Sequence, residues 1–257
     1  MISLITGASS GIGYEFAYIF AREKYDLILV ARSHDKLLEI KEDIEKKHGV
    51  TVRVIALNLT EANAANQLFN EIKRLDLSVD VLVNNAGFGL YGEFTAADWG
   101  VEEDMIKVNI LSLTQLTKLF STEMIKIKKG KILNLASTAA FFPGPFMAVY
   151  YATKAYVASF SQALNSELEG TGVTVTTLCP GPTTSHFQET AQAGGVKTFA
   201  GKLPSAREVA EFGFKELVAG KAVAIYGMKN KLLVWFARFL PRKFIVDEVK
   251  RIQRIRS

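Results

Sequence analysis

Tyr150 and Lys154 are the residues of this chain whose types and spacing point most directly to chemistry. On a helix, an i,i+4 spacing places both side chains on one face. The pKa of a free tyrosine is about 10, and a neighbouring ammonium favours the tyrosinate and so lowers that pKa toward neutrality. Such a pair can act as a general acid when a nearby hydrogen-bond donor polarises the group that receives the proton.

Ser137 is the candidate for that donor. It follows an apolar run at 132–136 and precedes Tyr150 by 13 residues. Tyr151 competes with Tyr150, because it lies three residues before Lys154 and i,i+3 residues are also neighbours on a helix. Taken alone, the Tyr–Lys spacing fits a pair on a helix surface equally well.

A second chemical feature is the octet Thr-Gly-Ala-Ser-Ser-Gly-Ile-Gly at residues 6–13. It follows an apolar run and precedes an amphipathic segment, so it predicts a strand-to-helix turn whose backbone N–H groups can bind a pyrophosphate. Gly7 would allow the tight turn, Gly11 a close backbone approach, and Gly13 the packing of the helix on the sheet. The spacing differs from the usual G-x-G-x-x-G, and an ordinary turn fits it as well.

The elements that must position these residues alternate along the chain. Runs rich in Val, Ile and Leu predict strands at 2–6, 26–31, 51–57, 80–84, 131–136, 173–179 and 222–226. Helical patterns lie at 11–23, 34–47, 61–75, 98–127, 150–168 and 205–219. They predict an α/β fold: a single doubly wound Rossmann-type domain with a central parallel sheet of about seven strands and helices on both faces. We expect this domain to span 1–227, followed by a basic amphipathic C-terminal helical extension at 228–257.

The composition fits a globular chain with a large core, since 49% of the 257 residues are hydrophobic and 22% are charged. Cys179 is the single cysteine, which excludes an internal disulfide and suits a reducing compartment, here the cytoplasm. No signal peptide is recognised, and no run reaches the roughly 20 apolar residues of a membrane span. His34, His48 and His186 share no metal-ligand spacing, so no metal site is expected.

The net charge of +5 is unevenly distributed. Residues 228–257 carry nine Lys or Arg and two Asp or Glu, a net of +7, so the other 227 residues sum to −2. A basic tail on a nearly neutral domain does not indicate that the protein binds nucleic acid. The tail also contains Trp235, Phe236 and Phe239, which favour packing on a second subunit or on the domain; peripheral contact with an anionic membrane through 229–257 is the alternative.

These motifs, in this order and spacing, resemble the short-chain dehydrogenase/reductase family over residues 2–227. The matching segments are 6–13, Asn84–Gly87, Ser137 with Tyr150 and Lys154, and Pro180–Gly181. The resemblance implies a homodimeric or homotetrameric oxidoreductase that moves a hydride between a nicotinamide cofactor and a carbonyl or alcohol carbon. It implies that the cofactor contacts Gly7, Ser9, Ser10, Gly11, Ile12, Gly13, Arg32, Asn58, Leu59, Asn85, Ala86, Gly87, Tyr150, Lys154, Pro180, Gly181 and Thr184.

The resemblance also implies catalytic roles. Ser137 would hydrogen-bond the substrate oxygen, and Tyr150 would transfer the proton. Lys154 would hold the nicotinamide ribose and lower the tyrosine pKa. Asn109 would complete a proton relay through a water near Lys154. The family's register selects Tyr150 over Tyr151.

Arg32 decides the predicted form of the cofactor. The second strand ends at Ala31, where an NAD enzyme usually has Asp or Glu for the ribose 2′-hydroxyl. A guanidinium directly after this position can bind a 2′-phosphate with two parallel hydrogen bonds, although a solvated surface arginine is the alternative. We therefore expect NADP(H).

Two positions depart from the family's pattern. Asn58 stands where Asp usually contacts the adenine, but its amide oxygen can still accept a hydrogen bond from the adenine amino group. Thr184 is the approximate match to a threonine that contacts the cofactor, in a Pro-Thr-Thr run that blurs the register.

The predicted substrate side of the site is apolar. Its candidate residues are Phe88, Leu90, Tyr91, Phe141, Phe142, Phe146, Met147 and Phe187. Core or oligomer contacts would explain several of them equally well. They predict a small hydrophobic carbonyl substrate or alcohol product, such as an acyl chain, steroid or aromatic ketone, under a mobile lid at 185–203. The leading function is an NADPH-dependent carbonyl reductase; an NADP(H)-binding sensor and an epimerase or dehydratase are the alternatives.

Overall fold

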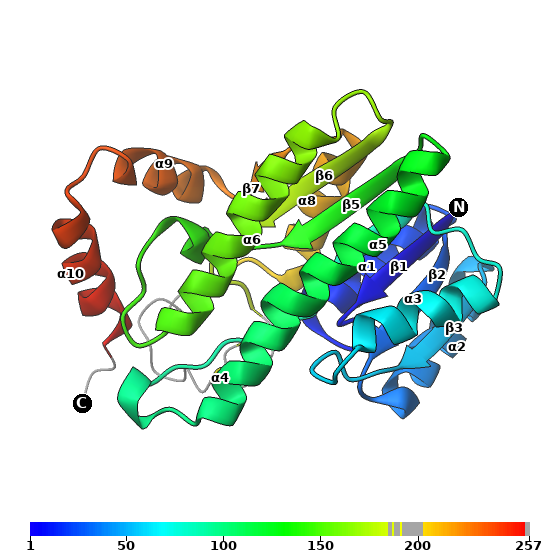
Figure 1. Cartoon of the computed structure of the whole chain (residues 1–257), viewed down its shortest axis with the longest axis horizontal. Helices are drawn as coiled ribbons and strands as arrows, with labels where there is room; N and C mark the ends of the chain where they lie inside the picture. The colour runs from blue at the N-terminus through cyan, green and yellow to red at the C-terminus, as the bar shows by residue number, and fades with distance from the viewer. Residues whose placement is uncertain (185–186, 188–190, 192–202, 255–257) are drawn as a thin grey trace.

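A computed structural model describes residues 1–184, 187, 191 and 203–254. At its centre is a seven-stranded, fully parallel sheet in the order β3-β2-β1-β4-β5-β6-β7 (Figure 1). The strands are β1 (Ile2–Thr6), β2 (Asp26–Ala31), β3 (Val52–Ala56), β4 (Val81–Asn84), β5 (Gly130–Leu135), β6 (Val173–Cys179) and β7 (Val223–Ile225). The predicted doubly wound α/β fold is confirmed, and each predicted strand is present to within one residue at either end.

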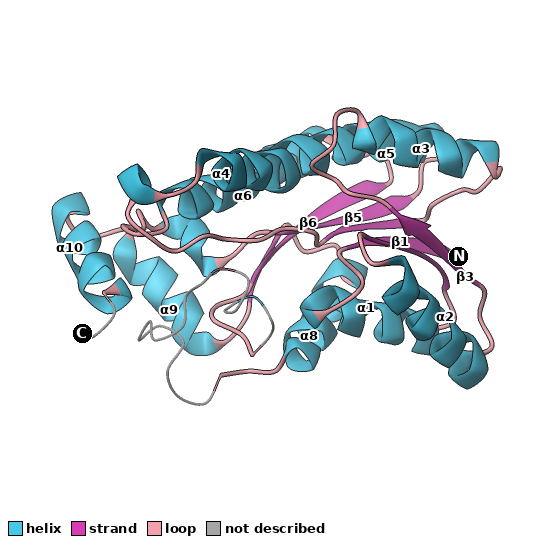
Figure 2. Ribbon diagram, turned by 90° about the horizontal axis from the view of Figure 1, so that it is seen from below, coloured by secondary structure: helices cyan, strands magenta, loops and turns pink. Residues whose placement is uncertain are grey.

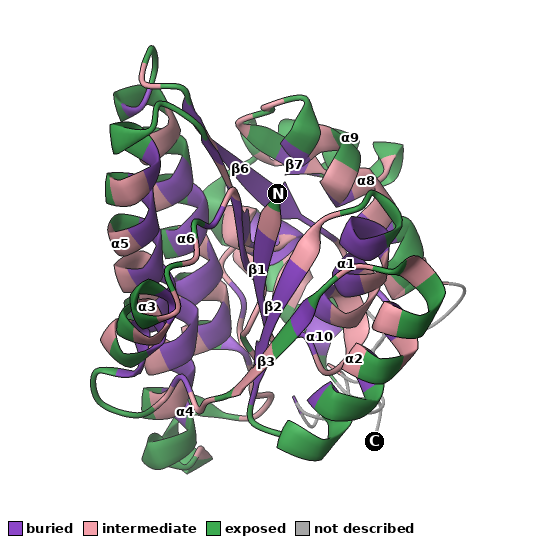
Figure 3. Cartoon of the chain, turned by 90° about the vertical axis from the view of Figure 1, so that its right-hand side faces the viewer, coloured by how far each residue is buried: buried purple, intermediate pink, exposed green. Residues whose placement is uncertain are grey.

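Helices cover both faces of the sheet (Figure 2). One face carries α1 (Gly11–Arg22), α2 (His34–His48) and α8 (Ala206–Val218). The other carries α3 (Ala64–Arg74), α4 (Trp99–Ile106), α5 (Leu113–Lys126) and α6 (Ala148–Glu167). The central strands between these layers are buried (Figure 3). Burial on both faces explains why the strands are nearly continuous apolar runs without alternation.

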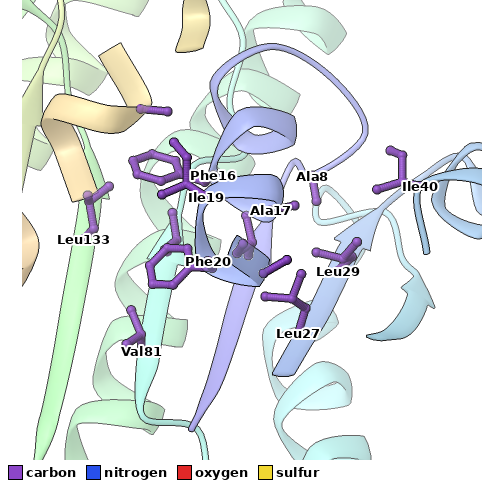
Figure 4. Packing of buried hydrophobic residues seen from close by; sticks show 14 of the residues in the cluster. Ala8, Phe16, Ala17, Ile19, Phe20, Leu27, Leu29, Ile40, Val81 and Leu133 are labelled. Carbon is purple, nitrogen blue, oxygen red and sulfur yellow. The ribbon is translucent and has the colours of Figure 1, made fainter. Parts of the chain in front are cut away.

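Helix α1 shows how a helical layer packs on the sheet. Phe16 and Phe20 lie one turn apart and are fully buried. They belong to one cluster with Leu27 and Leu29 of β2 and Leu133 of β5 (Figure 4). Each fully buried phenylalanine contributes about 1.5–3 kcal/mol. A second cluster fills the opposite face, so both layers hold the strand ends in place.

The order of the strands reverses at β1, which pairs with β2 on one side and β4 on the other. Chain segments leaving β1 and β4 therefore diverge, and ligands of doubly wound sheets bind in the resulting crevice at the carboxyl ends of the strands. The glycine-rich turn follows β1, Asn85 follows β4 and Ser137 lies just beyond β5. The sheet topology thus brings the predicted site residues to one edge.

The helix predicted over 98–127 contains a more widely wound segment that its sequence does not indicate. Between α4 and α5, residues Lys107–Ser112 wind as a π-helix. Such wider turns occur frequently at functional sites. Asn109 lies within this segment and is fully buried.

The C-terminal extension forms two helices instead of the single one expected. Helix α9 covers Met228–Ala237 and α10 covers Arg242–Gln253, both at the far end of the molecule from the N-terminus (Figure 1). Pro241 caps α10, and a proline disfavours helical backbone at the residue before it, here Leu240. Among the described helices, none combines the length and apolar character needed to cross a membrane.

Candidate active site

The predicted site residues surround a cavity of about 140 Å³ at the carboxyl ends of the strands. Its walls come from the start of α1, the ends of β4, β5 and β6, helix α6 and the last turn of α10. It is lined by Ile12, Asn85, Gly87, Leu135, Ala136, Ser137, Thr138, Ala139, Met147, Tyr150, Tyr151, Lys154, Pro180, Gly181, Pro182, Thr183, Phe187 and Gln253.

Thr6 and Asn85 fix the glycine-rich turn to the neighbouring strand. Thr6 Oγ1 accepts hydrogen bonds from the N–H groups of Asn85 and Ala86 at 3.1 and 3.0 Å. The Asn85 side-chain amide donates to the carbonyls of Thr6 and Gly7 at 3.0 and 3.1 Å. A Cβ on Gly13 would lie 2.3 Å from the Asn85 amide nitrogen and from the Gly7 oxygen. Glycine is therefore required at this position by contacts within the turn.

The start of α1 fits the phosphates of a dinucleotide. Gly7 and Gly11 have φ angles of +66° and +58°, a region that glycine adopts without strain. Ser9 lies in the same turn, and Ser10 precedes α1 without capping it through its side chain. The first N–H groups of the helix and both hydroxyls are thus available to bind an anion.

The residues expected around the adenosine lie at the ends of β2 and β3. Arg32 is exposed directly after β2, where a guanidinium can reach a ribose phosphate. Asn58 Oδ1 accepts the N–H of Thr60 at 3.2 Å, which leaves its second lone pair for another donor. Leu59 packs its side chain in the core, and its carbonyl accepts a hydrogen bond from Ser112 at 2.7 Å.

Ser137 and Tyr150 meet in the cavity. Ser137 caps a short 3-10 helix (Thr138–Phe141) by accepting the N–H of Ala139 at 3.1 Å, which orients its side chain. The Ser137 hydroxyl also donates to the Pro180 carbonyl at 3.4 Å. Tyr150, in the first turn of α6, is buried and lines the cavity together with Ser137. Tyr151 is hydrogen-bonded to α10. The Ser137 hydroxyl thus affects the pKa of Tyr150 and not that of Tyr151.

Lys154 is buried in the same wall of the cavity. Its Nζ donates to the carbonyl of Leu135 at 2.7 Å and lies 5.8 Å from the centre of the Tyr150 ring. Burial lowers the pKa of the Lys154 ammonium to about 8. This lysine therefore exchanges its proton much closer to neutral pH than a surface lysine does.

The expected lowering of the Tyr150 pKa does not occur in the chain alone. Burial raises the pKa of Tyr150 well above its usual value and outweighs the opposing effect of the Ser137 hydroxyl. The reason is that desolvation disfavours the charged tyrosinate more strongly than the neighbouring hydroxyl favours it. Tyr150 therefore retains its proton at neutral pH, as a proton donor must.

Asn109 braces the site from the π-helical segment. Its Oδ1 accepts the N–H of Phe88 at 3.2 Å, and its Nδ2 donates to the Phe88 carbonyl at 3.0 Å. Nδ2 also donates to Thr153 Oγ1 at 3.0 Å, and Thr153 in turn donates to the Tyr150 carbonyl at 2.7 Å. The side-chain amide of Asn109 thus holds the strand end and the helix that carry the site.

Gly87 lies against the side chains of Asn109 and Lys154. A Cβ at this position would lie 2.7 Å from Asn109 Oδ1 and 3.6 Å from Lys154 Nζ. Any larger residue at this position would push against Asn109, so glycine allows the close approach of the segment after β4 to the Asn109 side chain.

After β6, the structure places Thr183 in the cavity where the sequence assigned a contact to Thr184. Thr183 is buried, and its Oγ1 donates to the Gly181 carbonyl at 2.9 Å. Thr184 is exposed, and its N–H donates to the Pro204 carbonyl at 2.9 Å. The geometry therefore favours Thr183 for this contact. Pro180 and Gly181 line the cavity at the expected place.

The apolar wall is only partly the one expected. The residues that line the cavity or pack in the cluster around Tyr150 are Phe88, Leu90, Tyr91, Met147 and Phe187. Phe141 packs instead in a neighbouring core cluster, and Phe146 lines a separate, smaller cavity. Phe142 is half-buried and lines neither cavity. Most of the predicted lid at 185–203 lies outside the described residues.

The sequence did not anticipate the contribution of α10. Gln253, the last residue of this helix, lines the cavity and donates a hydrogen bond to the Tyr151 hydroxyl. The Tyr91 hydroxyl donates to the Gln253 carbonyl at 2.9 Å. A glutamine in a basic tail, far along the chain from the other site residues, carries no local signal of such a role.

The chemistry of the site is that of hydroxyl groups and one amine. No cluster of three or more His, Cys, Asp or Glu side chains suited to a metal occurs within 1–184, 187, 191 and 203–254. Cys179 is buried, and burial raises the pKa of its thiol to about 12. Ser137, Tyr150 and Lys154 beside a glycine-rich turn, at the switch point of a doubly wound sheet, define a dinucleotide-dependent oxidoreductase of the Rossmann type.

Comparison with known proteins identifies the family. The model of the short chain dehydrogenase family matches residues 1–194, and the chain belongs to this family. A very-long-chain 3-oxoacyl-CoA reductase from Phaeosphaeria nodorum is 39% identical over 177 residues, 67% of this chain and 52% of that protein. The rat 17-beta-hydroxysteroid dehydrogenase type 3 is 33% identical over 180 residues, 69% of this chain and 58% of its own. The chain therefore spans little more than half the length of these curated relatives.

Solved structures share the whole fold. A short-chain dehydrogenase from Sphingobium yanoikuyae in complex with NADPH is 29% identical, with a TM-score of 0.83 over 93% of both chains. An alcohol dehydrogenase from Comamonas testosteroni that is specific for bulky-bulky ketones is 28% identical, with a TM-score of 0.79 over 93% of this chain and 92% of that one. The similarity extends beyond the residues matched by the family model.

Proposed function

We propose that this protein is an NADPH-dependent reductase of bulky, hydrophobic ketones, which oxidises the matching alcohols in the reverse direction. The observation that carries the proposal is that Ser137, Tyr150 and the buried Lys154 line one cavity at the carboxyl ends of the strands. A substrate carbonyl oxygen in this cavity would meet two hydroxyl groups. One is that of Ser137, which the N–H of Ala139 orients, and the other is that of Tyr150, which is still protonated.

Each residue then has a defined task. Ser137, oriented by the N–H of Ala139, donates to the carbonyl oxygen and stabilises the charge that develops on it. Tyr150 transfers its proton to the same oxygen, and the Lys154 ammonium favours this transfer by stabilising the tyrosinate left behind. The nicotinamide, when bound, supplies the hydride for the carbonyl carbon.

NADP(H) is the cofactor that these residues fit. The pyrophosphate would bind at the start of α1, where Gly7 and Gly11 leave the backbone accessible. Arg32 follows β2 with an exposed guanidinium, and Ala31 stands where a carboxylate would repel a 2′-phosphate. The Sphingobium relative, described as an NADPH complex, supports the same assignment.

The substrate is inferred to be bulky and mostly apolar. Met147 and Phe187 line the cavity next to Tyr150, and such walls favour apolar groups. Relatives named for very-long-chain 3-oxoacyl-CoA and for bulky ketones support this class. A sensor without catalysis is disfavoured, because a site that only binds has no need of a proton donor such as Tyr150 with Ser137 and Lys154 beside it.

The test is to follow NADPH oxidation with steroid ketones, bulky aromatic ketones and long-chain 3-oxoacyl thioesters, with acetone as the small control. We expect kcat/KM for at least one bulky class to exceed that for acetone by tenfold or more. Absence of turnover with every class, while NADPH binds, would contradict the proposal.

We also propose that α9 and the start of α10 bind an anionic membrane surface. Large apolar side chains are exposed at Leu232, Leu233, Trp235, Phe236, Phe239, Leu240 and Phe244. Exposed cations lie between and beside them at Lys229, Lys231, Arg238, Arg242 and Lys243. This mixture fits the headgroup region of a bilayer, and each cation near an anionic surface contributes about 1 kcal/mol.

A second copy of the chain is the other candidate to cover this surface. Two copies meeting through their tails would bring together surfaces of net +7 each, which repel one another, whereas an anionic bilayer attracts them. Cosedimentation with vesicles containing phosphatidylglycerol should therefore capture the chain, and pure phosphatidylcholine vesicles should capture little.

Substitution of Trp235 and Phe239 by Ala should abolish the vesicle binding. Trp99→Ala, which removes a similarly exposed tryptophan elsewhere (62% against 53% for Trp235), is the matched control and should bind as the parent does. If the variant with both Trp235 and Phe239 replaced lost a dimer in light scattering but still bound vesicles as the parent does, the surface would be a subunit contact.

A further inference from the structure

The last helix of the described chain closes one side of the active-site cavity. Gln253 ends α10 and is only 2% exposed. Its sequence neighbours Ile252 and Arg254 are both exposed, so α10 turns this one polar side chain inward. Gln253 lines the same cavity as Tyr150 and Lys154.

Two tyrosines from distant segments hold Gln253 in place. The Tyr91 hydroxyl donates to its main-chain carbonyl at 2.9 Å, and its own Nε2 donates to the Tyr151 hydroxyl. Tyr151 follows the catalytic Tyr150 on α6, and the centres of the two rings are 6.1 Å apart. The glutamine is therefore fixed to the same turn of helix that carries the proton donor.

One atom of this arrangement has no partner. The Gln253 Oε1 is buried and accepts no hydrogen bond within the described part of the chain. Leaving a buried polar atom unpaired costs free energy, and native proteins rarely do so without a functional reason. Met147 and Phe187 add apolar side chains to the lining of the same cavity.

We propose that Gln253 is a substrate-recognition residue, whose Oε1 accepts a hydrogen bond from a hydroxyl or amide N–H on the substrate, at a distance from the carbonyl that is reduced. The inference rests on the proposed reductase function and narrows its substrate class: a bulky, apolar ketone that carries one hydrogen-bond donor. The donor satisfies the orphaned oxygen and orients the ketone toward Ser137 and Tyr150.

The neutral amide suits this task. A carboxylate at this position would have to lose its hydration on burial, at much greater cost than an amide. A site built to bind a substrate donor rejects the analogue that lacks it strongly, because the buried acceptor is then left unpaired. Gln253 would therefore set specificity, while Tyr150 and Ser137 carry out the chemistry.

Gln253→Met is the informative variant. It keeps the length of the side chain and removes its amide, while the hydrogen bond from Tyr91 remains because it is made to the main chain. Helix α10 should therefore stay in place. Tyr91→Phe is the matched control, since it removes that main-chain contact and leaves the amide of Gln253 intact.

The experiment uses one bulky ketone scaffold with a hydroxyl at successive positions, the corresponding methyl ethers, and the unsubstituted ketone. We expect the wild-type chain to prefer the hydroxyl compound at one position by tenfold or more in kcat/KM, mainly through KM. Gln253→Met should reduce this ratio to about 1, because the hydroxyl compound loses more in kcat/KM than the unsubstituted ketone does. The methyl ether, which keeps the oxygen but cannot donate, should lack the preference in both proteins.

Several results would overturn the proposal. The wild-type chain could show no preference for a hydroxyl at any position, or could prefer the methyl ether to the hydroxyl compound. The preference could also survive in Gln253→Met, or this variant could lose kcat/KM equally for all substrates. Calorimetry of the same compounds with the wild-type chain and with Gln253→Met, each in the presence of NADP⁺, measures the preference as a difference in affinity without turnover. Failure of the reductase function would appear as no reduction of any ketone, whereas failure of the Gln253 proposal would appear as equal affinities for the hydroxyl and unsubstituted compounds.

Discussion

Asn109 in the π-helical segment and Thr153 on α6 are joined by a buried hydrogen bond of 3.0 Å between Nδ2 and Oγ1. Thr153 directly precedes Lys154 and donates to the carbonyl of Tyr150 at 2.7 Å. The bond therefore connects an irregular stretch of helix to the one turn that carries both the proton donor and the lysine. Through its bonds to Phe88, Asn109 also connects that turn to the end of β4.

Replacing Asn109 with Leu should lower the free energy of unfolding by about 3 kcal/mol or more, because it leaves the N–H and carbonyl of Phe88 and the Thr153 hydroxyl without this partner. Thr153→Val removes one of these bonds to Asn109 and the bond from Thr153 to the Tyr150 carbonyl, and should cost about 1–2 kcal/mol. Urea unfolding of both variants measures the difference. Equal losses would show that the bonds to Phe88 contribute nothing.

Tyr150→Phe should lower kcat/KM by about 10²- to 10⁴-fold, because the general acid is lost. The affinity for NADPH should change little. Tyr151→Phe, the neighbouring substitution with the same change of atoms, should retain turnover of a ketone without a donor group. Steady-state kinetics with fluorescence titration of NADPH check both, and a larger loss in Tyr151→Phe would reverse the assignment of the two tyrosines.

The rate of reduction should fall as the pH rises through about 8. Burial lowers the pKa of Lys154 to about 8, so the ammonium is present below this pH and lost above it. The pKa of Tyr150 is raised, so the tyrosine remains protonated through the same range and does not cause the fall. A profile of kcat/KM against pH tests this, and an active Lys154→Arg variant should lose the limb near pH 8 because arginine stays charged.

Arg32→Ala should weaken NADPH binding by about 10- to 100-fold, which corresponds to the loss of a charge-assisted pair of hydrogen bonds. NADH binding should be almost unchanged, because NADH lacks the 2′-phosphate. Titration of the parent and the variant with NADPH and with NADH gives the ratio of the two affinities in each protein. An unchanged preference for NADPH would mean that another group binds the phosphate.

Several parts of the molecule followed from local sequence. The strands at 2–6, 26–31 and 173–179 were predicted at their observed bounds, because a strand covered on both faces must be apolar throughout. The octet at 6–13 indicated the turn after β1, since its glycines permit a backbone that other residues do not. Ser137 was expected directly after a strand, and the structure has it just beyond β5.

The pKa of Tyr150 illustrates where local reasoning fails. The i,i+4 spacing to Lys154 suggested a lowered value, but burial of the tyrosine has the larger effect and raises it. Burial depends on how α6 packs against the strand ends and the neighbouring loops, and spacing along one helix carries no information about it.

By itself, the sequence determined the order of the elements, the family and the identity of the chemical groups, because these depend on residue type and on spacing within short segments. The tertiary structure decided that Thr183 and not Thr184 lies in the cavity, that Asn109 belongs to a π-helical turn, and that Gln253 closes the site. Each of these results from contacts between segments that are distant along the chain. Such contacts form only when the sheet has brought those segments together.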